Sequence, residues 1–132
     1  MSVTLWMPQA PVVRVEPYPE EEPGYFITEP MEPFVEVNMS NTNFRDFMAV
    51  LLPGRDMDYC GTLSFDDCAR IYRNAFTVLN RDNLAKSMIE PEVRDGNMIY
   101  CGRDREYVDR RLQSLMTLCM VARAHRFEVV YG

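Results

Sequence analysis

The sequence predicts an α+β protein in which three helices pack on a small, mostly antiparallel sheet, with an irregular β-rich N-terminal arm. Three observations carry this prediction: β-branched segments near the start, apolar stripes at helical spacing further on, and a shift in charge. The first 38 residues hold seven Glu, one Arg and seven of the nine prolines, whereas residues 39–132 balance 13 acids against 13 bases. We therefore predict an acidic, proline-rich β arm over 1–38 and an α+β body over 39–132.

The arm contains short β-rich segments bounded by proline, which cannot donate to a strand ladder and so suits edge strands. These segments are Val3–Met7, Val12–Glu16, Tyr25–Thr28 and Phe34–Val37. Glu20, Glu21 and Glu22 stand among prolines between the second and third segments and predict a solvated loop. The arm is expected to be three or four irregular strands or partly extended chain.

The helices of the body are predicted from capping residues followed by apolar stripes. The run 40–43 opens a first helix that ends at Pro53-Gly54, and Ser64 with an acid three residues later opens a second helix over 65–80. Asp104 caps a third helix that runs to about Ala124. Asp95-Gly96 between apolar residues predicts a hairpin, and 127–131 predicts a closing strand.

Composition excludes several classes of protein. No apolar run approaches the ~20 residues that span a bilayer, and the first residues lack the features of a secretory signal, so a cytoplasmic location is expected. The four cysteines lack a C-x₂-C pair, which favours free thiols over a zinc site. A net charge of −6 argues against broad nucleic-acid binding, which needs clustered Lys and Arg.

The tripeptide Tyr-Cys-Gly precedes both long helices, at 59–61 and 100–102. The second copy continues into two arginines, and a helix N-terminus with guanidinium groups can bind an anion such as a nucleotide. The candidate ligand-binding residues are Tyr100, Gly102, Arg103, Arg105 and Tyr107. The alternative is that the glycine is a turn, Asp104 a cap and the arginines a solvated helix face.

The acidic arm predicts a second kind of site, with Glu20, Glu21 and Glu22 as candidate contacts to a basic protein surface. If the arm instead lies across the arginines of a neighbouring subunit, it is an oligomerisation device and the protein is a homo-oligomer.

Enzymatic activity finds little support in the sequence, and no catalytic residue, metal ligand or cofactor is assigned. The one histidine, His125, lies at a helix end without a nucleophile beside it. The acid pairs Asp66-Asp67 and Asp56/Asp58 leave a small metal-dependent hydrolase as an alternative, and a purely structural oligomerising protein is another.

Three segments of the body form one pattern: Ser40–Phe44, Tyr59–Gly61 and Tyr100–Leu112. In this pattern the chain resembles small accessory proteins of phages and prophages, over about residues 35–132. Most such proteins have no assigned activity, and some block host defence by occupying a basic nucleic-acid-binding surface or by sequestering a nucleotide signal. The resemblance implies a non-enzymatic protein that acts by stoichiometric binding, and it assigns no role to any single residue.

Overall fold

The computed structural model describes residues 1–96, 98–100 and 102–132 and shows an α+β fold, as predicted. Over these residues there are four helices, three of them longer than seven residues. They are α1 (Asn41–Leu51), α2 (Phe65–Leu79), α3 (Asp82–Ser87) and α4 (Arg105–His125). None of these helices is both long and apolar enough to cross a membrane.

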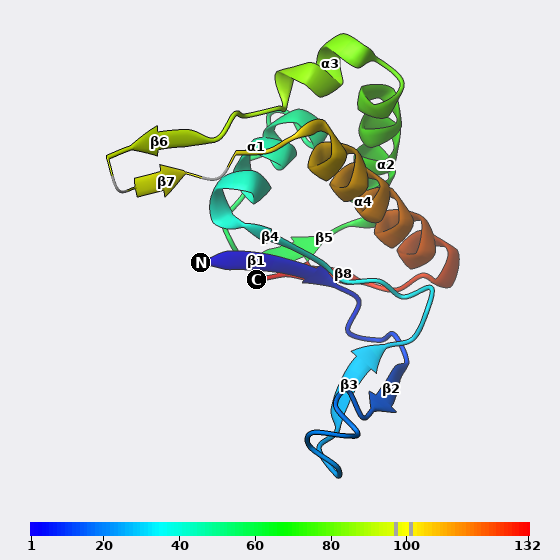
Figure 1. Ribbon diagram of the computed structural model, residues 1–132. Helices are drawn as coiled ribbons and strands as arrows, with labels where there is room; N and C mark the ends of the chain where they lie inside the picture. The colour runs from blue at the N-terminus through cyan, green and yellow to red at the C-terminus, as the bar shows by residue number, and fades with distance from the viewer. Residues whose placement is uncertain (97, 101) are drawn as a thin grey trace.

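A four-stranded antiparallel sheet underlies the helices. Its strands, in spatial order, are β4 (Val37–Ser40), β1 (Ser2–Trp6), β8 (Val129–Tyr131) and β5 (Gly61–Leu63). Figure 1 shows that all four helices lie on one side of this sheet. Alternate residues therefore face the core: Val3 and Leu5 of β1 are 1% and 0% exposed, whereas Ser2 is exposed.

Each long helix begins where its capping residue predicts. The side chains of Ser40, Ser64 and Asp104 accept hydrogen bonds from the backbone N–H groups three residues later. At α2 the bond is reciprocal, because the Asp67 carboxylate accepts from the Ser64 N–H at 2.9 Å. The three predicted helices are confirmed, since caps and apolar stripes act locally.

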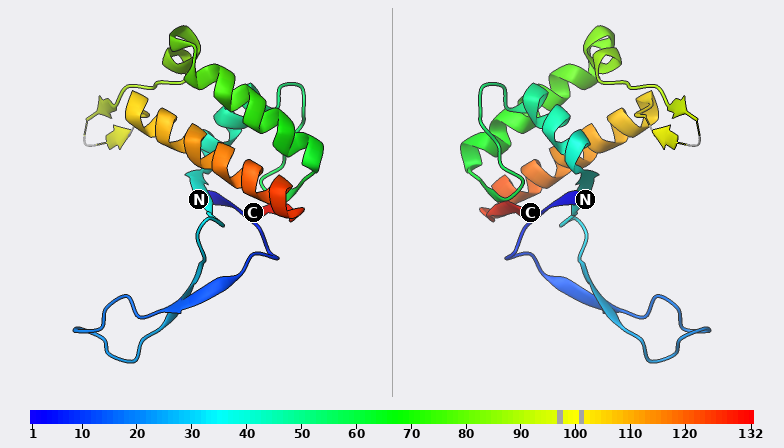
Figure 2. Two further views of the ribbon diagram at one scale, coloured as in Figure 1. Left: turned by 90° about the vertical axis from the view of Figure 1, so that its right-hand side faces the viewer. Right: turned by 90° about the vertical axis from the view of Figure 1, so that its left-hand side faces the viewer.

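Two hairpins extend from the body. The first joins β2 (Val12–Val15) to β3 (Ile27–Pro30), and the second joins β6 (Val93–Asp95) to β7 (Met98–Tyr100). The second confirms the predicted hairpin, and its Gly96 has a φ of 60°, which favours glycine. Figure 2 shows the first hairpin extended far from the helices and the central sheet.

The structure divides the chain differently from the predicted boundary at residue 38. Strands β1 and β4 lie in the central sheet, and Met7, Val37 and Met39 belong to the core. The part that projects is residues 8–36, which we call the hairpin arm. The two ends of the predicted arm are held in the body because their inward side chains bury apolar surface under the helices.

Candidate functional site

The start of α4 carries the predicted anion site, and the structure gives Gly102 a packing role there. Residue 90 and residue 103 form an isolated β-bridge, with hydrogen bonds of 2.9 and 2.7 Å between their backbone groups. A Cβ atom on Gly102 would overlap the carbonyl oxygen of Glu90. Glycine is required at this position by the close approach of two backbone segments, without any ligand.

Arg103 lies inside the protein. Its side chain is 6% exposed, and its Nε donates to the Met88 carbonyl oxygen at 3.0 Å. One terminal nitrogen donates to Asn43 and Asp46, each at 2.8 Å, and the other lies 3.3 Å from a Glu90 carboxylate oxygen. The guanidinium group thus joins the segment before α4 to α1, and the expectation that this arginine is solvated is wrong.

The other predicted anion ligands also have partners within the chain. Arg105 donates to Asp82 at 2.8 Å and to Asp109 at 3.0 Å. The Tyr107 hydroxyl accepts from the Asn43 amide at 3.1 Å. The side chain of Tyr100 lies outside the described residues.

Acidic side chains surround the hollow beside Gly102. This hollow has a volume of about 360 Å³, and its charged lining residues are three acids and one arginine: Glu90, Glu92, Asp104 and Arg103. Since that arginine already contacts Asp46 and Glu90, the hollow offers an anion little favourable charge. Anion binding at α4 stays a prediction, and the internal contacts account for these residues without it.

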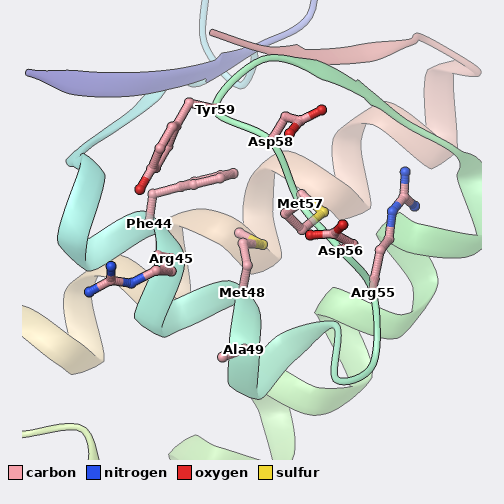
Figure 3. Close-up of a pocket in the computed structure, with 9 residues that line it drawn as sticks. All are labelled: Phe44, Arg45, Met48, Ala49, Arg55, Asp56, Met57, Asp58 and Tyr59. Atoms are coloured by element: carbon pink, nitrogen blue, oxygen red, sulfur yellow. The ribbon is translucent and has the colours of Figure 1, made fainter.

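A second hollow lies between α1 and the segment that precedes β5 (Figure 3). It has a volume of about 300 Å³, with Phe44, Met48 and Met57 as apolar lining. The charged residues at its rim are Arg45, Arg55, Asp56 and Asp58. Figure 3 shows the guanidinium groups of the two arginines directed away from the apolar lining.

Asp67 is a buried acid that both Arg55 and the start of α2 contact. Its side chain is 6% exposed and forms an ion pair with Arg55. Burial opposes ionisation, but hydrogen bonds from Arg55 and Ser64 outweigh it, so the pKa of the Asp67 carboxyl is lowered. Of the acid pair Asp66-Asp67, Asp67 therefore serves the cap of α2 and holds Arg55 in the loop before β5. Within the described residues, no three or more His, Cys, Asp or Glu side chains gather as metal ligands.

Two cysteines lie together in the core between α2 and α4. Cys68 and Cys119 are buried free thiols, and the hydrogen bond between them, with burial, raises the pKa of Cys119. Cys60 is an exposed free thiol, and Cys101 lies outside the described residues.

The hairpin arm brings together the acidic residues that the sequence singled out. It holds seven of the 20 acidic residues and one of the 14 basic residues, so the rest of the chain carries 13 of each. Across the described residues, none of the seven carboxylates lies in an ion pair. In the body, by contrast, six of the acids do: Asp46, Asp67, Asp82, Glu90, Glu92 and Asp109.

The loop at the tip of the hairpin arm is folded rather than extended. The Glu22 N–H donates to the Tyr18 carbonyl at 2.8 Å, and the Tyr25 N–H donates to the Glu22 carbonyl at 3.2 Å. The Gly24 N–H donates to the Glu16 carboxylate at 3.3 Å. Glu20, Glu21 and Glu22 are exposed in this turn, between aromatic side chains that sequence reasoning did not select: Tyr18, Tyr25 and Phe26, which are 55%, 48% and 41% exposed.

Aromatic contacts hold the base of the hairpin arm to the body. Phe34 packs edge-on against His125 with 4.9 Å between ring centroids, and His125 stacks on Phe127 at 5.5 Å. His125 thus contacts the arm as well as lying at the C-terminal end of α4, where a cation favours the helix dipole.

Comparison with family models, with curated proteins and with solved structures finds no match to this chain.

Proposed function

We propose that the protein is a non-enzymatic binding protein whose hairpin arm engages a basic surface on a partner protein. The observation that supports this most strongly is the separation of charge: the arm holds the whole net charge of −6, and it projects clear of a body with balanced charges (Figure 2). Such an arrangement steers association with a cationic surface.

The contacts available at the tip suit protein recognition. Exposed carboxylates can accept from lysine or arginine, and exposed aromatic rings add apolar area that a partner can cover. Tyrosine is enriched at interfaces because its ring is apolar and its hydroxyl is polar. The tip offers both kinds of contact within the turn from Tyr18 to Phe26.

Arginine-rich probes test the electrostatic part of this proposal. We expect an oligoarginine peptide, titrated by calorimetry at low salt, to bind the full chain and to bind the triple variant Glu20→Gln, Glu21→Gln, Glu22→Gln about tenfold more weakly. The loss should shrink as added salt screens exposed charges beyond about 8 Å.

The matched control removes three exposed acids from the body instead, with Asp56→Asn, Asp58→Asn and Glu106→Gln. It carries the same net charge as the arm variant and should bind the peptide nearly as well as the natural chain. Equal weakening in both variants would show that net charge alone drives binding, and the arm would lose its assigned role.

The resemblance to phage accessory proteins supports one form of this function. In that form the protein inhibits a host defence protein by binding the basic surface of that host protein. The hairpin arm supplies the acidic contacts that this form requires. A nucleotide-sequestering form has less support, because Arg103 and Arg105 already contact carboxylates of the same chain.

A further inference from the structure

The outer face of the helix pair α2 and α4 is apolar and open to solvent. The two helices pack side by side and run in opposite directions, and in the left view of Figure 2 no other described element lies in front of them. A groove of about 370 Å³ lies between them. Its lining residues are Tyr72 and Leu79 of α2, with Gln113, Met116, Thr117 and Met120 of α4.

Large apolar side chains on this face are exposed. Phe76 and Met120 are 55% and 52% exposed, and Phe65 at the start of α2 is 50% exposed. Along α2, Phe65, Tyr72, Phe76 and Leu79 follow one another at intervals of seven, four and three residues, which places them on one side of the helix. An exposed apolar stripe of this kind marks an interaction surface.

Three exposed arginines border the groove, and none of them lies in an ion pair within the described part of the chain. Arg73 lies in the part of α2 that lines the groove. Arg110 and Arg123 lie about one turn beyond Gln113 and Met120, at the two ends of the part of α4 that lines it. Positive charge therefore surrounds an apolar centre.

The acids of the two helices do not cancel this charge. Asp109 already accepts a hydrogen bond from Arg105 at 3.0 Å. Asp66 and Glu106 are exposed in the first turns of α2 and α4, and each lies about 10 Å along the helix axis from the nearest lining residue. The border of the groove is therefore positive in net charge.

We propose that this groove binds an amphipathic helix of a partner protein, in which acidic residues flank an apolar stripe. Charge complementarity identifies the occupant, because the acids can pair with the three bordering arginines while the stripe covers the apolar centre. Anchor residues at positions i, i+4 and i+7 of a helix span about 10 Å, which is also the length of α2 from Tyr72 to Leu79. Methionine is flexible, so Met116 and Met120 can adapt to the anchors.

This surface lies on the body and uses no residue of the hairpin arm. The inference therefore goes beyond the proposed binding of a basic partner by the arm. It gives the protein a second contact surface, with the opposite charge preference.

Two designed peptides of about 18 residues test the proposal. Both carry leucine at helical spacing on one side, and their flanking positions are all glutamate in one peptide and all lysine in the other. Fluorescence anisotropy of each labelled peptide, titrated with the full chain, gives its affinity. We expect the glutamate peptide to bind at micromolar concentration, about tenfold more tightly than the lysine peptide.

A first pair of variants tests the apolar centre. Phe76→Gln with Met120→Gln should weaken binding of the glutamate peptide about tenfold, because both side chains supply exposed apolar area to the groove. The matched control is Val50→Gln with Val93→Gln, which removes two exposed apolar side chains elsewhere and should bind like the natural chain. The melting midpoint of each variant shows whether the body is folded.

A second pair of variants tests the charged border. Arg73→Gln with Arg123→Gln should weaken binding of the glutamate peptide, and the loss should shrink as added salt screens these charges. Arg45→Gln with Arg94→Gln has the same net charge and removes two exposed arginines outside the groove, so it should bind normally.

Several results would overturn the proposal. They are an absence of glutamate-peptide binding up to about 1 mM, equal affinity for the two peptides, and unchanged binding in either groove variant. A dimer of the natural chain in sedimentation equilibrium that dissociates in Phe76→Gln with Met120→Gln would assign the face to a second copy instead. Binding of anionic phospholipid vesicles without binding of the glutamate peptide would assign it to a membrane surface. The arm variants leave the groove intact, so the oligoarginine result stands or fails independently.

Discussion

Arg103 is predicted to be a major contributor to the stability of the fold. Arg103→Ala removes three hydrogen bonds from a charged donor, to Met88, Asn43 and Asp46, together with the ion pair to Glu90. Hydrogen bonds to charged groups contribute about 1.5–3 kcal/mol each, and a buried carbonyl left without a donor costs about 1–3 kcal/mol.

Solvent lowers the total loss of stability. The side chains of Asp46 and Glu90 are 32% and 55% exposed, so water can replace the arginine as their hydrogen-bond donor. The Met88 carbonyl is buried and has no such substitute. We therefore expect Arg103→Ala to lower the free energy of unfolding by about 3 kcal/mol and the melting temperature by about 9–15 °C.

Urea denaturation followed by circular dichroism measures this loss directly. Arg105→Ala is the matched control, because it removes an arginine from the same segment whose ion pairs are exposed to solvent, and its midpoint should stay close to that of the natural chain. If Arg103→Ala unfolds at the same urea concentration as the control, Arg103 is not the buried link between α1 and the segment before α4.

Two further predictions concern packing and pH. Gly102→Ala should destabilise the protein severely, because its Cβ would overlap the Glu90 carbonyl, whereas Gly132→Ala has room and should be neutral in the same denaturation assay. Asp67→Asn should cost about 1–3 kcal/mol at pH 7, because it removes the charge that Arg55 pairs with. The pKa of Asp67 lies below its ordinary value of 3.8, so its contribution is full above that pH and is lost as the pH falls through the lower value. The difference in free energy of unfolding between Asp67→Asn and the natural chain should therefore disappear in acid. A difference that stays constant down to pH 2 would contradict this assignment.

Local signals in the sequence predicted the long helices well. The Ser64 capping box and the Asp104 cap each act within three residues, so their effect is readable without knowledge of the fold. The Asp95-Gly96 turn is local in the same way. The helix α3 and the strand β5 escaped notice because they have six and three residues, too few to show a period.

Long-range contacts limited the rest of the prediction. Asn43 and Asp46 precede Arg103 by 60 and 57 residues, so nothing in the local pattern distinguishes this buried arginine from a solvated one. The membership of β1 in the central sheet depends equally on β8, at the far end of the chain. The charge of the arm was readable from composition, but its folded tip and exposed aromatic residues were not.

A photo-crosslinking amino acid at position 21 tests the central claim most directly. Installed in place of Glu21 in the full chain, in the cells that make the protein, it should form an adduct with one basic partner protein. The same group in place of Asp58, an exposed acid on the body, should form none. Adducts from position 58 with none from position 21 would contradict the assignment of partner binding to the hairpin arm.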